Sequence, residues 1–244
     1  EFTPATSALM AEMVKEAWDE KEVAIFDGGP EVGQAFSGLA FDHLLFTGAT
    51  SIAKHIMTAA ARNLVPVTLE LAGKSPVIIS RSADIDKSIG RVMLGKTMNA
   101  GQICLAPDYL MVPEEKLHEV IAAAQDAVAG MYPKLLDNDD YTSVINERHY
   151  DRLNGYLAEA EERGVKVIAI NPANEDFSAQ HGTRKIPPTL ISEPADDMKV
   201  MQEELFGPLL AIKTYKEFEE TINFVNANPR PLAAYYFGEN KAEE

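Results

Sequence analysis

The sequence has little cysteine and fewer basic than acidic residues. Cys104 is the only cysteine among 244 residues, so no disulfide can form within the chain, and a reducing compartment, which we expect to be the cytoplasm, fits best. Lys and Arg number 22 against 38 Asp and Glu, which gives a formal net charge of −16. Because nucleic acids bind concentrated basic faces, we expect no nucleic-acid partner.

Long apolar runs and grouped metal ligands are also missing. No stretch approaches the roughly 20 apolar residues that span a bilayer, so we expect no membrane insertion. The histidines lack the spacing of metal ligands, so we expect no metal site; they are His43, His55, His118, His149 and His181. The chain does hold 46% hydrophobic residues, enough for a substantial core.

Strand-like and helix-like patterns alternate along residues 1–71. This alternation is typical of an α/β fold built on a doubly wound parallel sheet. Because a parallel sheet that starts on a helix implies an earlier strand, we expect the chain to be the later portion of a longer protein. The predicted helices are 3–18, 31–39 and 51–62, and the predicted strands are 22–27, 43–47 and 65–71.

The pattern restarts after Gly73 and predicts a second α/β domain over residues 72–244. Residues 171–188, rich in Asn, Pro, Gly and charge, are expected to form a surface loop. The predicted strands are 77–80, 108–112, 165–170, 209–214 and 232–237, and the predicted helices are 84–98, 114–129, 147–163 and 218–226.

Cys104 lies in the segment MNAGQICLAP (98–107), between a helical pattern and an apolar extended run. It is therefore expected at a junction of elements, where reacting groups are commonly presented. A free cysteine is more often a small buried hydrophobe, so alone it is weak evidence of catalysis. Glu70 lies in the strand-like segment LELAGKSP (69–76). By itself it is more simply interpreted as a surface or salt-linked group at a strand edge than as a buried catalytic acid.

Together these segments resemble the motifs of the aldehyde dehydrogenase superfamily. The resemblance continues through FTG (46–48), QEELFGP (202–208) and PLA (231–233), in the family's order. The segment APDY (106–109) after the cysteine resembles the corresponding segment in a class 3-like branch of the family, which includes the coniferyl aldehyde dehydrogenases.

The resemblance implies a cysteine nucleophile, Cys104, and a general base, Glu70. The implied reaction is NAD(P)-dependent oxidation of an aldehyde to the acid through a thiohemiacetal and a thioester. The implied substrate is aromatic, such as coniferyl aldehyde, or medium-chain aliphatic. Residues 1–71 would be part of a Rossmann-like dinucleotide-binding domain and residues 72–244 a catalytic domain without its C-terminal end. The family also implies a homodimer or homotetramer.

The resemblance also implies five cofactor-binding residues. Thr47 and Gly48 would receive the pyrophosphate, because backbone amides at a helix N-terminus bind phosphate groups. Glu204 would hold the nicotinamide ribose, and Phe206 would pack beside the ring. Glu1 would contact the adenosine ribose hydroxyls, which favours NAD and leaves NADP possible.

Two other functions stay open at this stage. A thiol and a base suffice for a cofactor-independent esterase or acyl-transfer activity. Alternatively, the chain is a catalytically silent fragment that acts as an assembly module. The upstream lysine and asparagine of the family's site fall outside the sequence, so we expect the isolated chain to have weak activity or none.

Overall fold

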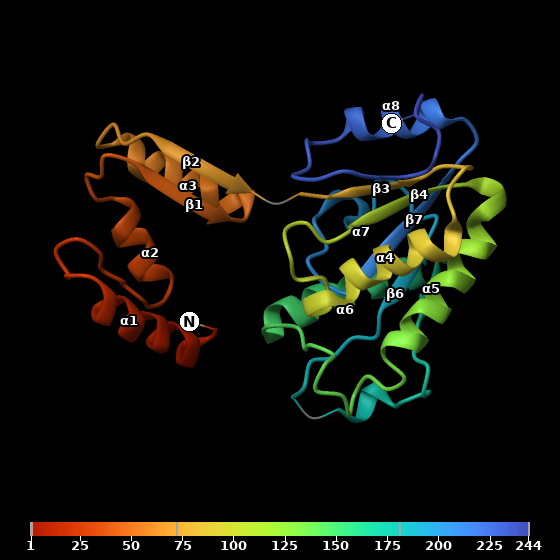
Figure 1. Ribbon diagram of the computed structural model, residues 1–244, viewed down its shortest axis with the longest axis horizontal. Coiled ribbons are helices and arrows are strands. Elements are labelled where there is room, and N and C mark those ends of the chain that lie inside the picture. The colour runs from red at the N-terminus through yellow and green to blue at the C-terminus, as the bar shows by residue number, and fades with distance from the viewer. Residues whose placement is uncertain (1, 72, 181, 244) are drawn as a thin grey trace. The chain divides into compact units, whose positions relative to one another are not determined.

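The computed structural model describes residues 2–71, 73–180 and 182–243. The chain forms two compact units, Glu1–Leu71 and Ala72–Glu244 (Figure 1). Helices and parallel strands alternate in both units, so the predicted α/β class is confirmed.

The first unit contains a strand–helix–strand crossover. β1 and β2 pair in parallel, in register from Leu44 opposite Val67 to Gly48 opposite Leu71, and α3 supplies the connection that parallel strands require. A small core of Leu44, Ala60 and Val65 lies between them. In order, the elements are α1 (Pro4–Ala17), α2 (Pro30–Ser37), β1 (Leu44–Gly48), α3 (Thr50–Ala61) and β2 (Val67–Leu71).

Two details near the start of the first unit differ from expectation. The strand predicted over residues 22–27 is wrong, because residues 23–28 are irregular and pair with no strand among the described residues. Thr3 is the N-cap residue of α1 and Pro4 occupies its first turn, but the Thr3 side chain makes no capping hydrogen bond. No residue of α1 is buried.

A central sheet organises the second unit. Among the described residues its order is β5-β6-β7-β4-β3-β8, and all neighbouring pairs are parallel except β5 with β6. The sequence did not predict β6, which directly follows Pro187 and Pro188. The strands are β3 (Pro76–Ile79), β4 (Tyr109–Pro113), β5 (Lys166–Ala169), β6 (Thr189–Ser192), β7 (Leu209–Tyr215) and β8 (Tyr235–Phe237).

Helices flank the sheet, and two of the longest begin at side-chain caps. The Asp84 carboxylate accepts the Lys87 amide at 3.1 Å before α4, and Asn146 accepts the His149 amide at 2.9 Å before α6. The helices are α4 (Ile85–Thr97), α5 (Leu117–Met131), α6 (Glu147–Glu162), α7 (Lys199–Gln202) and α8 (Phe218–Ala227), with shorter turns η1 (Met98–Gly101), η2 (Glu114–Lys116) and η3 (Phe177–Ala179).

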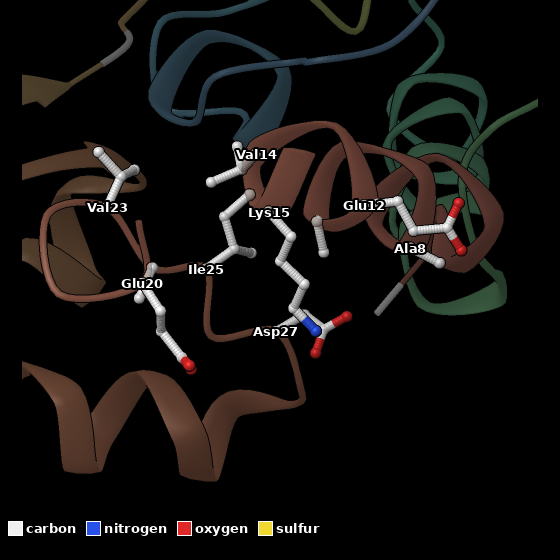
Figure 2. A pocket seen from close by; sticks show the side chains of 10 residues that line it. Ala8, Glu12, Val14, Lys15, Glu20, Val23, Ile25 and Asp27 are labelled. Carbon is white, nitrogen blue, oxygen red and sulfur yellow. The ribbon is translucent and has the colours of Figure 1, made fainter. Parts of the chain in front are cut away.

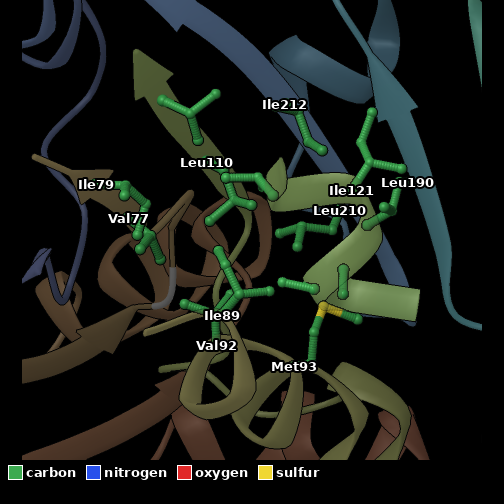
Figure 3. Packing of buried hydrophobic residues seen from close by; sticks show 14 of the residues in the cluster. Val77, Ile79, Ile89, Val92, Met93, Leu110, Ile121, Leu190, Leu210 and Ile212 are labelled. Carbon is green, nitrogen blue, oxygen red and sulfur yellow. The ribbon is translucent and has the colours of Figure 1, made fainter. Parts of the chain in front are cut away.

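The strands bury alternate residues on opposite faces of the sheet. Leu110 and Ile212 point to the face covered by α4 and α5, where Ile89 packs against them (Figure 3). Tyr109 and Ala211 point to the other face and its cluster with α6 and α7. This alternation, with period two, fixes the strand register and therefore the positions of the strand ends that carry the site.

One lysine is buried at the C-terminal end of α4. Lys96 is 1% exposed, and burial lowers its pKa to about 8 even though the carboxylates of Asp108 and Glu204 oppose the shift. The nearby ammonium of Lys74 lowers the pKa further. The core of the second unit therefore contains a cation at a cost in stability.

We predict that Lys96→Met stabilises the second unit at neutral pH. The unfolded chain holds the Lys96 proton more tightly between about pH 8 and its ordinary pKa of 10.5, so this lysine makes stability rise with pH across that window. Lys96→Met should raise the free energy of unfolding by up to about 3 kcal/mol near neutral pH, and this gain should shrink as the pH approaches 10.5.

Urea denaturation of the parent and variant chains at several pH values measures this difference. Lys87→Met, on an exposed position of the same helix, is the matched control and should change little. A destabilised Lys96→Met chain near neutral pH would mean that the neighbouring carboxylates outweigh the cost of burial.

Candidate active site

A buried ion pair joins the starts of two neighbouring strands. Lys74, just before β3, donates to the carboxylate of Asp108, just before β4, and Asp108 is 2% exposed. The Asp108 amide also donates to the Ser75 carbonyl at 2.9 Å. The other carboxylate oxygen of Asp108 accepts the Leu205 amide at 2.9 Å. One carboxylate thus connects β3, β4 and the segment after α7.

The segment that carries Glu204 is held by two cations. The Lys74 ammonium donates to the carbonyls of Val200 at 2.8 Å and Glu203 at 3.0 Å. From α6, the Arg152 guanidinium donates to the carbonyls of Glu204 at 3.0 Å and Leu205 at 2.7 Å. These bonds satisfy carbonyls that would otherwise be left without partners and fix the backbone of Glu204.

Glu204 carries a perturbed carboxyl group. Burial raises its pKa to about 7, and the negative charge of Asp108 adds to the rise. A hydrogen bond from the Gly73 amide, with the charges of Lys74 and Arg152, opposes it. A carboxyl group that changes charge near neutral pH is a common property of functional sites.

The residues after Glu204 form a tight backbone turn. Phe206 has φ 44°, a left-handed conformation that is uncommon for an aromatic residue, and the residue is 37% exposed. A Cβ on Gly207 would meet the Leu153 side chain of α6 at 2.5 Å, so any larger residue there would displace that buried leucine. The turn therefore presents an aromatic ring at the surface beside Glu204.

Cys104 follows a strained connection at the end of α4. Asn99, Ala100 and Gly101 have φ 50°, 52° and 71°, three successive left-handed residues. A Cβ on Gly101 would lie 2.3 Å from the Gly207 carbonyl oxygen, so the cysteine segment and the Phe206 turn are in backbone contact. Strain of this kind costs about 1–3 kcal/mol per non-glycine residue and occurs mainly at functional sites.

A side-chain amide fastens the connection on one side of the cysteine. The Gln102 amide nitrogen donates to the carbonyls of Asn99 and Ser143, both at 3.0 Å. Its oxygen accepts the Ile145 amide at 2.9 Å. Cys104 itself lies in a turn between η1 and β4 and is partly buried, so the prediction that it lies at a junction of elements is confirmed.

The predicted residues of the first unit gather at the carboxyl end of its sheet. Thr47 and Glu70 are directly paired across β1 and β2, and Gly48 ends β1. α3 begins two residues later without a side-chain cap, which leaves amides of its first turn open to an anion. The Glu70 side chain is exposed.

The sequence-predicted residues thus fall into two groups. Thr47, Gly48 and Glu70 belong to the first unit, and Cys104, Glu204 and Phe206 belong to the second. Glu1 lies outside the described residues.

A separate hollow lies in the first unit and contains none of the predicted site residues. It has a volume of about 310 Å³ (Figure 2) and is lined by Ala8, Ala11, Glu12, Val14, Lys15, Glu20, Val23, Ala24, Ile25 and Asp27. Within residues 2–71, 73–180 and 182–243, no helix is long and apolar enough to cross a membrane. The same residues contain no group of three or more His, Cys, Asp or Glu side chains that could hold a metal ion.

Sequence comparisons identify the family of the chain. The profile of the aldehyde dehydrogenase family matches residues 1–244. The chain is 62% identical over 244 residues to the "Probable coniferyl aldehyde dehydrogenase" of Caulobacter vibrioides, covering 100% of this chain and 50% of that protein. It is 58% identical over 243 residues to the coniferyl aldehyde dehydrogenase of a Pseudomonas species, with the same coverage. The chain therefore belongs to the aldehyde dehydrogenase family.

A class 3 relative and two solved structures extend the comparison. Aldehyde dehydrogenase family 3 member A2 of Rattus norvegicus is 38% identical over 241 residues, 98% of this chain and 48% of that protein. The substrate-bound AldH of Staphylococcus aureus superimposes with a TM-score of 0.89 at 35% identity, covering 100% of this chain and 51% of that chain. A mutant of the P. syringae indole-3-acetaldehyde dehydrogenase AldA, in complex with NAD+ and IAA, superimposes with a TM-score of 0.77 at 26% identity. The match covers 87% of this chain and 43% of that chain.

These matches confirm the predicted resemblance to the class 3-like and coniferyl branch. The chain spans about half the length of the curated relatives it matches.

Several residues that shape the site were not predicted from the sequence. Lys74 and Asp108 both lie in the motifs of the resemblance, but nothing in the sequence indicates that they pair. Arg152 and Tyr156 lie on one face of α6, four positions apart, where they resemble an ordinary solvated pair. In the structure Tyr156 donates to the Glu203 carboxylate at 2.6 Å, so α6 holds both neighbouring glutamates.

We predict that Gly101→Ala destabilises the second unit by roughly 2–5 kcal/mol, because alanine disfavours the left-handed backbone and its methyl group collides with the Gly207 carbonyl. The urea midpoint measures the loss. Gly155→Ala is the matched control: it lies within α6 with open space around it, and should gain about 0.5–1 kcal/mol. Equal midpoints for the two variants would contradict the close approach at Gly101.

We predict that Glu204→Gln raises thermal stability above neutral pH and leaves it nearly unchanged at about pH 5. The folded state keeps the Glu204 proton up to about pH 7, whereas the unfolded chain loses it near the ordinary value of 4.5, so this group lowers stability as pH rises between those values. After allowance for solvent screening the gain is roughly 1 kcal/mol, or about 2–4 °C in Tm.

Thermal melts across this pH range test the prediction, with the exposed Glu161→Gln on α6 as control. A Glu204→Gln melting curve that follows the parent at every pH would show that this carboxyl group ionises freely.

Proposed function

We propose that this chain is part of an NAD(P)-dependent aldehyde dehydrogenase. The observation that carries the proposal is the backbone contact between the strained cysteine segment at Gly101 and the Gly207 turn, which also bears Phe206 and Glu204. This contact brings together the two backbone segments that carry the proposed nucleophile and the proposed cofactor-binding residues.

Cys104 is the proposed nucleophile. Its sulfur adds to the aldehyde carbon, and the former aldehyde oxygen takes up negative charge as the thiohemiacetal forms. A backbone amide of the turn, that of Cys104, is the proposed donor to this oxygen; a well-placed donor of this type contributes about 3–4 kcal/mol. When bound, the nicotinamide supplies the hydride acceptor that converts the thiohemiacetal into a thioester.

Glu70 is the proposed general base for hydrolysis of the thioester. Its carboxylate takes a proton from water as the water attacks the acyl carbon, and the thiol of Cys104 is released with the acid. The position of Glu70 at the carboxyl end of β2, directly paired with Thr47, supports a role near bound ligand, because open parallel sheets bind ligands beyond the carboxyl ends of their strands.

The residues present fit a nicotinamide dinucleotide. Thr47 and Gly48 lead into the uncapped N-terminus of α3, which suits a pyrophosphate. Glu204, with its backbone fixed by Arg152, is proposed to accept hydrogen bonds from the ribose hydroxyls, and Phe206 to pack beside the ring. In this proposal residues 1–71 are the cofactor-binding domain and residues 72–244 the catalytic domain.

NAD is preferred over NADP in this proposal, on the basis of the Glu1 carboxylate, which would repel a 2′-phosphate. The names of the Caulobacter and Pseudomonas relatives support coniferyl aldehyde as substrate, with other aromatic or medium-chain aldehydes as the wider class. A cytoplasmic location and a homodimer or homotetramer remain predictions of the sequence and its resemblance.

The test is oxidation of coniferyl aldehyde by the full-length protein with NAD, followed through the absorbance of the reduced cofactor. Cys104→Ser should lower kcat by on the order of 1000-fold or more, because the thiohemiacetal cannot form efficiently. A rate near that of the parent in Cys104→Ser would remove Cys104 as nucleophile, and ester hydrolysis without NAD would favour a simple thiol hydrolase.

Glu70→Gln should lower the steady-state rate of cofactor reduction by about 100-fold or more, while an initial burst of reduced cofactor remains. Mass spectrometry should then find an acyl group on Cys104, because the thioester forms but is not hydrolysed. Glu16→Gln, on an exposed position of α1 in the same unit, is the control. If the variant loses both the burst and the steady-state rate, Glu70 does not act in thioester hydrolysis alone.

A further inference from the structure

The turn that carries Cys104 is anchored on a second side. The Ala106 amide donates to the Ile103 carbonyl at 2.9 Å, so Cys104 and Leu105 are the two central residues of a hydrogen-bonded turn. The Leu105 carbonyl accepts a hydrogen bond from the hydroxyl of Tyr235 at 2.6 Å. This bond fixes the peptide between Leu105 and Ala106, one residue after the cysteine.

Tyr235 is itself held at the edge of the sheet. It is the first residue of β8 and lies opposite Val77 of β3 in parallel register. Its ring is partly buried against the core on the α4 and α5 face. With the ring packed at one end and the hydroxyl bonded at the other, the side chain forms a rigid connection from β8 to the turn.

The phenol is suited to act as a permanent donor. Burial raises the pKa of Tyr235, and the negative charge that Cys104 carries as a thiolate raises it further. The hydroxyl therefore keeps its proton across the pH range in which a cysteine ionises. The phenol bonds the residue that follows the cysteine, which agrees with this electrostatic influence.

We propose that Tyr235 is a positioning residue for Cys104: by donating to the Leu105 carbonyl, it holds the turn in the orientation from which the thiol reacts. The inference rests on the proposed role of Cys104 as nucleophile. Gln102 fastens the chain before the cysteine and Tyr235 fastens it after, so the thiol is held from both directions.

The neighbouring residue supplies a matched control. Tyr236 belongs to the same strand, and its hydroxyl donates to the Asn240 carbonyl and the Glu243 carboxylate, both at 3.1 Å. Its ring packs edge-on against the Phe218 ring, with 6.1 Å between the ring centroids. Tyr235→Phe and Tyr236→Phe each remove one phenolic hydroxyl from β8, but only the first change releases the cysteine turn.

The first measurement is alkylation of Cys104 by iodoacetamide across a range of pH, with peptide mass spectrometry to confirm the modified residue. Tyr235→Phe should change the rate constant about three- to tenfold and displace its pH profile, as expected for loss of one hydrogen bond. Tyr236→Phe should follow the parent. This measurement needs no cofactor, so it stands even if the proposed dehydrogenase activity is not found.

The second measurement is turnover of coniferyl aldehyde by the full-length protein. Tyr235→Phe should lower kcat about tenfold with KM nearly unchanged, and para-aminophenylalanine at position 235, which restores a donor, should recover part of the loss. Thermal melts identify any variant that fails to fold, in which case the aniline variant carries the comparison. Parent-like alkylation and kcat in a folded Tyr235→Phe protein would overturn the proposal.

Discussion

The second unit depends on the buried pair of Lys74 and Asp108. Asp108 fixes the starts of β3 and β4 and the Leu205 amide, while Lys74 extends to the Val200 and Glu203 carbonyls. A buried pair of this kind gives little net stability, yet removal of one partner leaves an unpaired charge and costs about 3–5 kcal/mol. Its main effect is therefore geometric, because it makes the ends of two strands and the Glu204 segment a single rigid group.

Two strained backbone segments meet beside this pair. Asn99 and Ala100 on one side and Phe206 on the other have positive φ, and the glycines next to them, Gly101 and Gly207, permit contact without side chains between them. The core fixes both segments, because α4 and α6 are anchored by apolar packing on opposite faces of the sheet. Packing energy from the core thus maintains a backbone arrangement that would not persist in an isolated loop.

Local patterns predicted most helices and strands, because apolar periodicity is a property of each segment. They failed where strand formation depends on a neighbouring strand. The apolar residues 23–26 suggested a strand but pair with none among the described residues. Conversely, β6 is a strand because it pairs with β5 and β7. The resemblance indicated Cys104 and Glu204 as candidate site residues. It could not supply the bonds of Tyr235 or Arg152, since contacts between residues far apart in sequence leave no local pattern.

The bond from Tyr235 to Leu105 joins positions 130 residues apart, and Lys74 reaches Val200 across 126. A ribosome therefore releases the thiol long before it releases the groups that hold the thiol in place. During synthesis the local helices around the cysteine can form early, whereas the bond from Tyr235 forms only after β8 has been made. The turn around this sulfur therefore gains its bond from Tyr235 late, when β8 pairs with β3.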